Sequence, residues 1–453
     1  MLCIGEKLNS YSDQYLEVEG NTKLCGEINI QGAKNSALVL MAASILSNEE
    51  INLYNFPNLT DIEVMKNILT SLGVSNTQND NHMKIKAINL INRKLPKELV
   101  SELRASFTLI GALITRFNEV CIPLPGGCKI GSRPIDEHIK GLKKLGVSIQ
   151  IKNQEVIAKT ENQLNGAEIS LDFPSVGATE TLIMASVLAK GTTILKNAAR
   201  EPEVQDLAIM LNKMGANISG TGTQEIIIEG VDSLSGCNHN VIPDRIEAGT
   251  FLIAAAATGS ELKLNNVNHL HLKAVINKLE LCGNKFEVSP HSLKIKPIDK
   301  NAVDVITAPY PGFPTDLQSP FMVLMSISNG ISNITELMFE NRLSHVSQLI
   351  KLGADIKVKD RTATINGVHN LRGNKILGSD LRSAAAMVIA GLIAKGNSTI
   401  EGLNHLDRGY ENFEKKLNKL GAQIIRKDLI TSKPKTIDNI TPNKNIEKEI
   451  SAA

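Results

Sequence analysis

Leu142-Lys143-Lys144-Leu145-Gly146 ends a predicted amphipathic helix, and the same five-residue pattern recurs along the chain. The pattern has two apolar residues three positions apart and then glycine, the residue that most readily adopts the left-handed backbone at helix ends. Its six copies occupy residues 69–73, 142–146, 211–215, 279–283, 349–353 and 417–421. The final glycines are separated by 73, 69, 68, 70 and 68 residues. This regular spacing predicts six structural units of about 70 residues.

Each unit also contains a second predicted helix that is rich in alanine and apolar on almost every side, which is typical of a buried helix. These segments are 35–46, 105–116, 178–189, 248–257, 316–328 and 382–394. Short alternating or β-branched runs, such as 51–54, 225–229 and 362–365, predict strands. The expected unit is strand, buried helix, strand, amphipathic helix, strand, strand. Because 453 residues exceed what one core usually serves, we expect an α/β protein of two domains with three units each.

The composition argues against several classes of function. The 49 basic and 47 acidic residues give a net charge of +2, so no overall field favours nucleic acid or a membrane surface. Aromatic residues are 3% of the chain, too few for a surface that stacks single-stranded nucleic acid. The six cysteines form no C-x-x-C pair, and there is no Walker loop or Rossmann fingerprint. We therefore expect no metal and no cofactor, and a cytoplasmic protein with reduced thiols.

A glycine-rich loop, Leu124-Pro-Gly-Gly-Cys-Lys-Ile-Gly-Ser-Arg-Pro134, carries a single thiol among positive charges. Lys129 and Arg133 would favour the thiolate form of Cys128 and attract an anionic substrate. The alternative is a surface turn with an incidental cysteine.

Basic residues recur where predicted helices begin, which is unusual because helix N-termini favour acids. Lys34, Arg104 and Arg382 precede or open buried helices, while Arg133, Arg200, Arg342 and Arg408 precede amphipathic ones. Helix N-termini already attract anions, so several of these ends are predicted to bind a negatively charged ligand. The alternative for any one of them is pairing with a neighbouring carboxylate.

Asp316 follows a proline turn at the start of a buried helix. A carboxylate there suits a general base that accepts a hydroxyl proton, and it equally suits a helix N-cap. His138 lies one turn into the helix after the cysteine loop, and we expect it to be structural.

Ten ordered motifs between about Leu16 and Arg426 resemble the UDP-N-acetylglucosamine enolpyruvyl transferases. They are Gly32-Ala-Lys-Asn35, Leu103-Arg-Ala-Ser106, the loop 124–134, Ser175-Val-Gly-Ala-Thr179, Ala199-Arg-Glu-Pro-Glu203, Pro243-Asp-Arg-Ile-Glu247, Phe313-Pro-Thr-Asp316, Phe339-Glu-Asn-Arg342, Asp380-Leu-Arg382 and Asp407-Arg-Gly-Tyr410. The related shikimate-pathway transferases share the six-unit fold, but this chain resembles them less because they lack the Cys128 loop.

The resemblance implies two inside-out α/β domains of three βαβαββ units, joined by a double crossover, with the site between them. Residues 1–34 and 243–428 would form the first domain, 35–242 the second, and 429–453 a flexible tail. The implied reaction transfers the enolpyruvyl group of phosphoenolpyruvate to the 3-hydroxyl of UDP-N-acetylglucosamine through a tetrahedral intermediate, with release of phosphate. This step commits the sugar to peptidoglycan, and hence to cell-wall biogenesis, cell shape and cell division.

The resemblance also implies roles for individual residues. Cys128 matches the proton donor, which forms a covalent adduct and is alkylated by fosfomycin, and Asp316 matches the proposed base. Phosphoenolpyruvate would be held by Lys34, Asn35, Arg133 and Arg408. The nucleotide sugar would contact Arg104, Arg133, Pro134, Ile135, Asp136, Glu137, Pro174, Ser175, Val176, Asp316 and Met338. Arg342, Asp380 and Arg382 would support the site.

Two alternatives remain open on the sequence. One is a non-catalytic regulator that binds the nucleotide sugar on the same fold and releases no phosphate. The other is a shikimate-type enolpyruvyl transferase.

Overall fold

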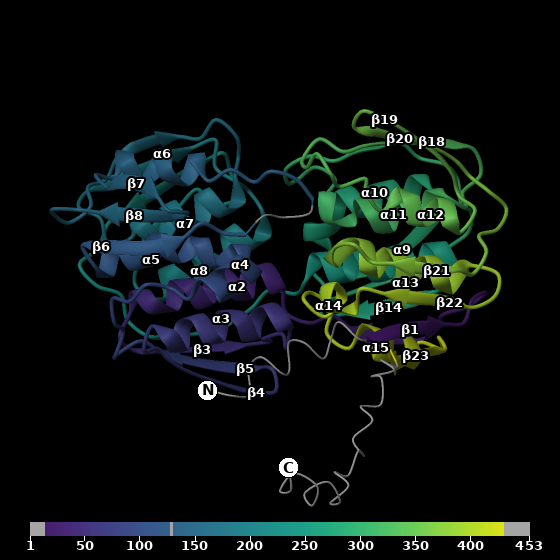
Figure 1. Cartoon of the computed structure of the whole chain (residues 1–453), viewed down its shortest axis with the longest axis horizontal. Helices are drawn as coiled ribbons and strands as arrows, with labels where there is room; N and C mark the ends of the chain where they lie inside the picture. Colours follow the sequence, from purple (N-terminus) through teal and green to yellow (C-terminus); the bar gives the residue numbers. More distant parts are fainter. Residues whose placement is uncertain (1–13, 127–129, 430–453) are drawn as a thin grey trace, which may run out of the picture.

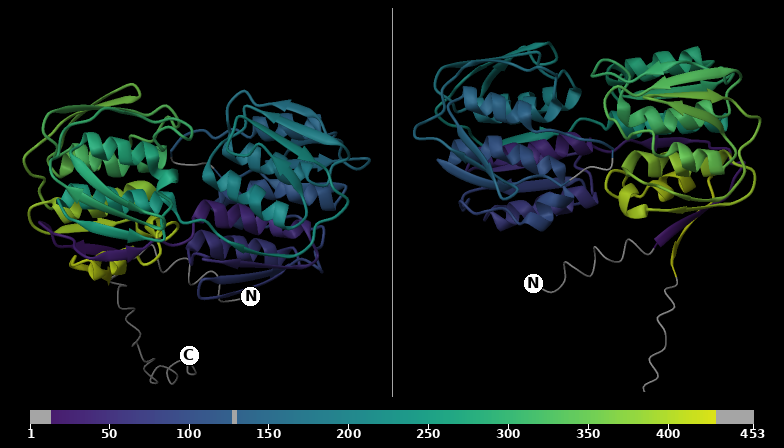
Figure 2. Two further views of the ribbon diagram at one scale, coloured as in Figure 1. Left: turned by 180° about the vertical axis from the view of Figure 1, so that it is seen from behind. Right: turned by 45° about the horizontal axis from the view of Figure 1, so that its top comes forward.

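The computed structural model describes residues 14–126 and 130–429, which form two lobes side by side (Figures 1 and 2). In the first lobe the strands are β3 (Glu50–Tyr54), β4 (Ser75–Asn79), β5 (His82–Lys86), β6 (Glu119–Pro123), β7 (Ser148–Lys152), β8 (Glu155–Lys159), β9 (Glu168–Ser170), β10 (Thr192–Lys196), β11 (Asn217–Ser219), β12 (Glu225–Glu229) and β13 (Cys237–Asn240). Its helices are α2 (Lys34–Ala43), η2 (Ser44–Leu46), α3 (Thr60–Ser71), α4 (Lys97–Glu102), η3 (Arg104–Thr108), α5 (Leu109–Arg116), α6 (Asp136–Lys144), α7 (Val176–Ser186) and α8 (Pro202–Lys213). These strands pair in the orders β13-β3-β5-β4, β6-β8-β7 and β11-β12-β10-β9.

The second lobe repeats this plan with the N-terminal strands added. Its strands are β1 (Gln14–Val18), β2 (Glu27–Asn29), β14 (Leu262–Asn265), β15 (Asn284–Ser289), β16 (Ser292–Pro297), β17 (Val305–Ile306), β18 (Ile331–Thr335), β19 (Asp355–Lys359), β20 (Thr362–Asn366), β21 (Lys375–Leu377), β22 (Ser398–Glu401) and β23 (Ile424–Asp428). Its helices are α9 (Arg245–Thr258), η4 (His269–Leu272), α10 (Lys273–Leu281), η5 (Thr315–Leu317), α11 (Gln318–Met325), α12 (Val346–Lys351), α13 (Leu381–Ile393), α14 (Leu403–Leu406) and α15 (Phe413–Lys419). The pairing orders are β21-β22-β1-β23, β15-β16-β14-β2 and β17-β18-β20-β19.

The glycines of the repeated pattern lie just after the amphipathic helices, as predicted. All six have φ between +80° and +105°, a backbone conformation that strains any residue with a Cβ. Gly146, for example, has φ +98° and follows α6, so the helix stops there.

The alanine-rich helices lie inside the lobes and the sheets outside. Every residue of α9 after Arg245 is buried, and α9 packs against α11 and α13. In the first lobe α5 packs against α2 and α7. Helices without an amphipathic face need apolar neighbours on all sides, which this inside-out arrangement provides.

Almost all of the buried apolar residues of the described chain fall into two clusters. One runs from Ala37 to Val241, and the other combines 16–30 with 246–424. The chain changes lobe twice at one place, where the Ala33 amide donates to the Ile242 carbonyl (2.7 Å) and the Asp244 amide to Gln31 (2.8 Å). As a result β2 pairs in parallel with β14 of the second lobe, while β13 returns to pair with β3 of the first.

The second unit departs from the predicted pattern. Its sheet, β6-β8-β7, has three strands in the described residues, where four were expected. The segment before its buried helix forms α4, preceded by Pro96 at the N-cap, and proline cannot donate a hydrogen bond to a β-ladder.

No helix within 14–126 and 130–429 combines the length and apolarity needed to cross a membrane.

Candidate active site

Several of the predicted site residues lie at the N-terminal ends of the buried helices. Lys34 opens α2, Arg104 opens η3, and Ser175 caps α7 by accepting a hydrogen bond from the Ala178 amide. Asp316 lies in η5, and Arg382 lies in the first turn of α13. These ends expose unpaired N–H groups, so the fold brings basic side chains and helix N-termini together.

Asp316 is held by two arginines of the second lobe. Its carboxylate oxygens accept hydrogen bonds from Arg342 (2.8 Å) and Arg382 (3.0 Å). Burial by itself raises the pKa of Asp316, but Arg382, Arg342 and, more weakly, Arg245 hold it well below its usual range. The Asp316 side chain is 25% exposed, so it remains open to a substrate.

Arg382 is fixed from two further directions. Its guanidinium lies 5.4 Å from the ring centroid of Tyr410. Asp380, predicted to support the site, caps α13 by accepting hydrogen bonds from the Arg382 and Ser383 amides. The Asp380 cap therefore sets the position from which Arg382 reaches Asp316.

Phe339 connects the lobes through its ring. The guanidiniums of Arg133, from the first lobe, and Arg342, from the second, lie 5.4 and 5.6 Å from the ring centroid. Arg104 donates to the carbonyl oxygen of Arg133. A cation over an aromatic face is stabilised by the quadrupole of the ring, so Phe339 holds two like charges near each other.

The C-terminal part of the cysteine loop contacts the second lobe. The Asn341 amide donates to the Ile130 carbonyl (2.9 Å), and the Ser132 hydroxyl donates to Glu340 (3.1 Å). Cys128 itself lies outside the described residues, so its predicted role stays a prediction.

Lys34 and Arg408, both predicted to hold phosphoenolpyruvate, meet at Asp61. Lys34 Nζ lies 2.7 Å from one carboxylate oxygen, and Arg408 Nε lies 2.8 Å from the other. Burial lowers the pKa of Lys34, an effect that Asp61 opposes and that Arg382 and Arg408 increase. Arg382, which pairs with Asp316, also lowers the pKa of Lys34, so the charges around Asp61 and those around Asp316 interact with one another.

The residues predicted for the nucleotide sugar begin two helices of the first lobe and one segment of the second. Pro134 and Ile135 precede α6, and Asp136 and Glu137 form its first turn. Pro174 and Val176 flank the α7 cap, and Met338 follows β18, where its amide donates to Glu336 (2.8 Å). Asn35, predicted to bind phosphoenolpyruvate, is exposed on α2. The Glu137 carboxylate accepts a hydrogen bond from the Asp172 amide (3.1 Å), so the start of α6 contacts the segment that precedes α7.

His138 is buried, as expected for a structural residue. It forms a 3.0 Å hydrogen bond with Thr181 and packs edge-on against Phe107. Burial, together with Arg104 and Arg133, lowers its pKa to about 3, so it is neutral near pH 7.

Asp61 and Phe339 were not assigned roles from the sequence. Asp61 stands in the first turn of α3, where an acid is ordinary helix-dipole chemistry. Phe339 belongs to a motif that was recognised for Arg342. No local signal distinguishes either residue.

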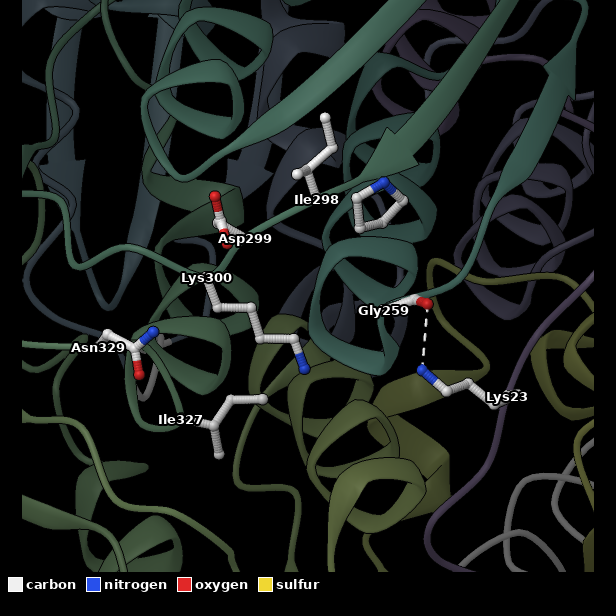
Figure 3. Close-up of a pocket in the computed structure, with 8 residues that line it drawn as sticks. Lys23, Gly259, Ile298, Asp299, Lys300, Ile327 and Asn329 are labelled. Atoms are coloured by element: carbon white, nitrogen blue, oxygen red, sulfur yellow. Dashed lines mark hydrogen bonds between the residues drawn. The ribbon is translucent and has the colours of Figure 1, made fainter.

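A cavity of about 380 Å³ lies away from this site, at the other end of α9 (Figure 3). Its lining includes Gly259, Asp299, Lys23 and Lys300. The two ammonium groups donate to carbonyls at the end of α9, Lys23 to Thr258 (2.7 Å) and Lys300 to Ala257 (2.5 Å). The 14 residues of α9 span about 20 Å, and the lysines act there as a C-terminal cap.

Within the described ranges, no group of three or more His, Cys, Asp or Glu side chains is arranged to hold a metal ion.

Known proteins are similar to this chain in sequence and in fold. The profile of the EPSP synthase (3-phosphoshikimate 1-carboxyvinyltransferase) family matches residues 18–417. UDP-N-acetylglucosamine 1-carboxyvinyltransferases of Prochlorococcus marinus are 56% identical over 94% of both chains (strain MIT 9312) and 55% identical over the whole of both chains (strain MIT 9515).

Two solved structures share the fold at low sequence identity. The enolpyruvyl transferase NikO from Streptomyces tendae is 23% identical with a TM-score of 0.84, covering 92% of this chain and 99% of that one. EPSP synthase from Acinetobacter baumannii is 18% identical with a TM-score of 0.72, covering 92% and 100%. The family profile and the close relatives agree over nearly the whole chain, which therefore belongs to the EPSP synthase family and, within it, to the UDP-N-acetylglucosamine 1-carboxyvinyltransferases.

Proposed function

We propose that this enzyme transfers the enolpyruvyl group of phosphoenolpyruvate to the 3-hydroxyl of UDP-N-acetylglucosamine and releases phosphate. The observation that carries the proposal is a set of four cations contributed by both lobes, of which Lys34 and Arg382 lie at the starts of buried helices, while Arg133 and Arg408 approach from loops. Phosphoenolpyruvate has about three negative charges near neutral pH, from one phosphate and one carboxylate. Cations and helix N-termini in a partly desolvated site bind such an anion strongly.

The reaction needs one acid and one base on different groups. In the addition step carbon-3 of phosphoenolpyruvate gains a proton, the sugar 3-oxygen bonds to carbon-2, and the hydroxyl proton leaves to a carboxylate. In the elimination step the bond from carbon-2 to the phosphate oxygen breaks as the protonated carboxyl gives its proton to the departing phosphate, and carbon-3 gives a proton back to the group that supplied one in the addition, which restores both groups. We assign the acid to Cys128 and the base to Asp316.

The pairing of Asp316 limits how it acts. With Arg342 and Arg382 at 2.8 and 3.0 Å, its carboxylate is a weak base towards a free hydroxyl. The hydroxyl becomes strongly acidic only as its oxygen bonds to carbon-2, so Asp316 orients the sugar first and accepts the proton late in the addition. Lys34, Arg133 and Arg408, which are assigned to phosphoenolpyruvate, stabilise the negative charge that the phosphate carries away.

The nucleotide sugar is assigned to the starts of α6 and α7 together with Met338, with Arg104 and Arg133 facing its phosphates. Asn35 is assigned to phosphoenolpyruvate beside Lys34, and Asp380 supports the site through its cap. We propose that the product enters peptidoglycan synthesis, that the enzyme thereby serves cell-wall biogenesis, cell shape and cell division, and that it acts in the cytoplasm.

Phosphate release tests the proposal. Phosphoenolpyruvate with UDP-N-acetylglucosamine should release phosphate, and phosphoenolpyruvate with shikimate 3-phosphate should not. Binding of the nucleotide sugar without release would favour a regulator, and release only with shikimate 3-phosphate would favour the other transferase.

Variants of the two assigned residues test the roles. Cys128→Ser and Asp316→Asn should each lower kcat by about 100-fold or more, because each loses a proton-transfer group. Fosfomycin should inactivate the wild type with a mass increase of one adduct, and leave Cys128→Ser unmodified. Full activity of Cys128→Ser with unchanged fosfomycin sensitivity would remove Cys128 from the mechanism.

A further inference from the structure

Asp61 is a buried carboxylate that joins cations from the two lobes. Its side chain is 3% exposed and lies in the first turn of α3. Lys34, at the start of α2, contacts one carboxylate oxygen at 2.7 Å, and Arg408, just after α14, contacts the other at 2.8 Å. One carboxylate thus sets the distance between two cations that lie on segments far apart in the sequence.

Backbone contacts on either side make this a joint between the lobes. The Thr60 amide donates to the Asp407 carbonyl (3.2 Å), and the Asn58 amide donates to Glu411 (3.2 Å). Asp61 is the buried ionic contact of the joint. The position of Arg408 relative to Lys34 therefore depends on how residues 58–61 meet residues 407–411.

The charges around Lys34 are predominantly positive. Arg382 and Arg408 both disfavour its ammonium form, and burial does so more strongly than either. Asp61 is the carboxylate that opposes them, whereas Asp244 accepts from the backbone amide of Lys34 (3.2 Å). Glu102 lies beside Arg408, which donates to its backbone carbonyl (3.3 Å), and the Glu102 carboxyl interacts electrostatically with Arg408 and Asp61.

The carboxylate itself is stabilised as an anion. Burial raises the pKa of Asp61, but Lys34 and Arg408 outweigh burial and bring it below its ordinary value. An ammonium has three donors and a guanidinium five, so each cation can keep Asp61 and still donate to a phosphate oxygen.

On these observations, and resting on the function proposed above, we infer that Asp61 is a positioning residue for the phosphate of phosphoenolpyruvate. It holds Lys34 and Arg408 on two sides of one anion position, and it keeps Lys34 charged until the substrate arrives. Because the two cations come from different lobes, Asp61 links the meeting of the lobes to the assembly of the phosphate site.

The test compares Asp61→Asn with Glu63→Gln. Glu63 is an exposed acid in the same helical turn, paired with Lys66, so its loss matches the helix-dipole effect without touching the site. Asp61→Asn should raise KM for phosphoenolpyruvate by about tenfold or more while changing KM for UDP-N-acetylglucosamine by less than about threefold. Glu63→Gln should leave both KM values near those of the wild type.

The pH profile separates positioning from a merely structural role. Asp61 opposes the lowering of the Lys34 pKa, so without it the basic limb of kcat/KM for phosphoenolpyruvate should move to lower pH. If Asp61→Asn does not fold, Asp61→Glu, which keeps the charge, should keep the basic limb in place while raising KM. Glu411→Gln, at the same joint but away from Lys34, should not move the limb.

The possible failures are distinguishable. A wild type that releases no phosphate would overturn the proposed function. An active wild type whose Asp61→Asn variant has unchanged KM values and the pH profile of Glu63→Gln would overturn the role of Asp61 alone. An equal rise in both KM values would do the same, because it would indicate general damage.

Discussion

Asp316 takes its chemical character from arginines that lie 26 and 66 positions away in the chain. In isolation it would be an ordinary carboxylate at a helix start. Arg342 and Arg382 instead make it a strongly stabilised anion that orients a hydroxyl before it accepts a proton. At the scale of residues, the candidate site is a set of paired charges, and Asp61 has the same character.

This pairing predicts how acid affects stability. A carboxylate whose pKa is depressed in the folded state contributes stability above its unfolded pKa of about 4, and the contribution is lost as pH falls through the folded value. The free energy of unfolding of the wild type should therefore exceed that of Asp316→Asn most at neutral pH. The difference should shrink below about pH 4.

Urea unfolding of both proteins between pH 3 and pH 7 measures this difference. Asp61 is present in both, so its own contribution cancels. A difference that stays constant with pH would contradict the assignment of the depressed pKa to Asp316.

At the scale of elements, the six units are specified by how their helices end. Gly146 follows α6 with φ +98°, and an added Cβ would meet no atom within 4 Å. The need for glycine there is therefore one of backbone conformation and not of space. The same pattern at six positions explains why the helices were predictable from the sequence.

Gly146→Ala should destabilise the protein by about 1–2 kcal/mol, because an L-residue is strained at positive φ. Gly146→Asn is the matched control and should lose less, since asparagine tolerates this backbone better than alanine. Urea unfolding measures both variants. Equal stability of Gly146→Ala and the wild type would show that this backbone conformation carries no strain for alanine.

The strands were less predictable than the helices. The second unit has α4 in place of a leading strand, and β2 and β13 each complete a sheet whose other strands are remote in sequence. Strand runs of three or four residues carry little local signal, and their partners depend on the path of the chain.

At the scale of the molecule, the lobes differ in how the chain builds them. The first has all its strands between β3 and β13 and an apolar cluster from Ala37 to Val241. The second needs β1 and β2 from the N-terminal segment as well as residues 246–424. We propose 35–242 as one domain and 1–34 with 243–428 as the other. The boundary falls inside the first turn of α2, so Lys34, the residue before it, opens a helix of the first lobe. The tail 429–453 lies almost wholly outside the described residues.

A fragment of residues 35–242 should therefore fold alone and unfold cooperatively, because its core and its sheets are complete. Residues 243–428 without the N-terminal segment should not, since β1 and β2 would be missing from two sheets. Circular dichroism during thermal unfolding distinguishes the two. A fragment 35–242 without a cooperative transition would contradict the proposed boundaries.

The sequence by itself determined the buried and amphipathic helices of the six units and the glycines that end the latter, because these depend on periodicity and backbone preference within one or two turns. Through a resemblance, the sequence also assigned Lys34, Asp316 and Arg408 to the candidate site. The tertiary structure decided which charges meet. Asp61 and Arg408 are 347 positions apart, and they pair only because the chain crosses twice between the lobes and brings α3 against the segment after α14. No local pattern encodes such a contact, since it depends on how two separately built lobes pack.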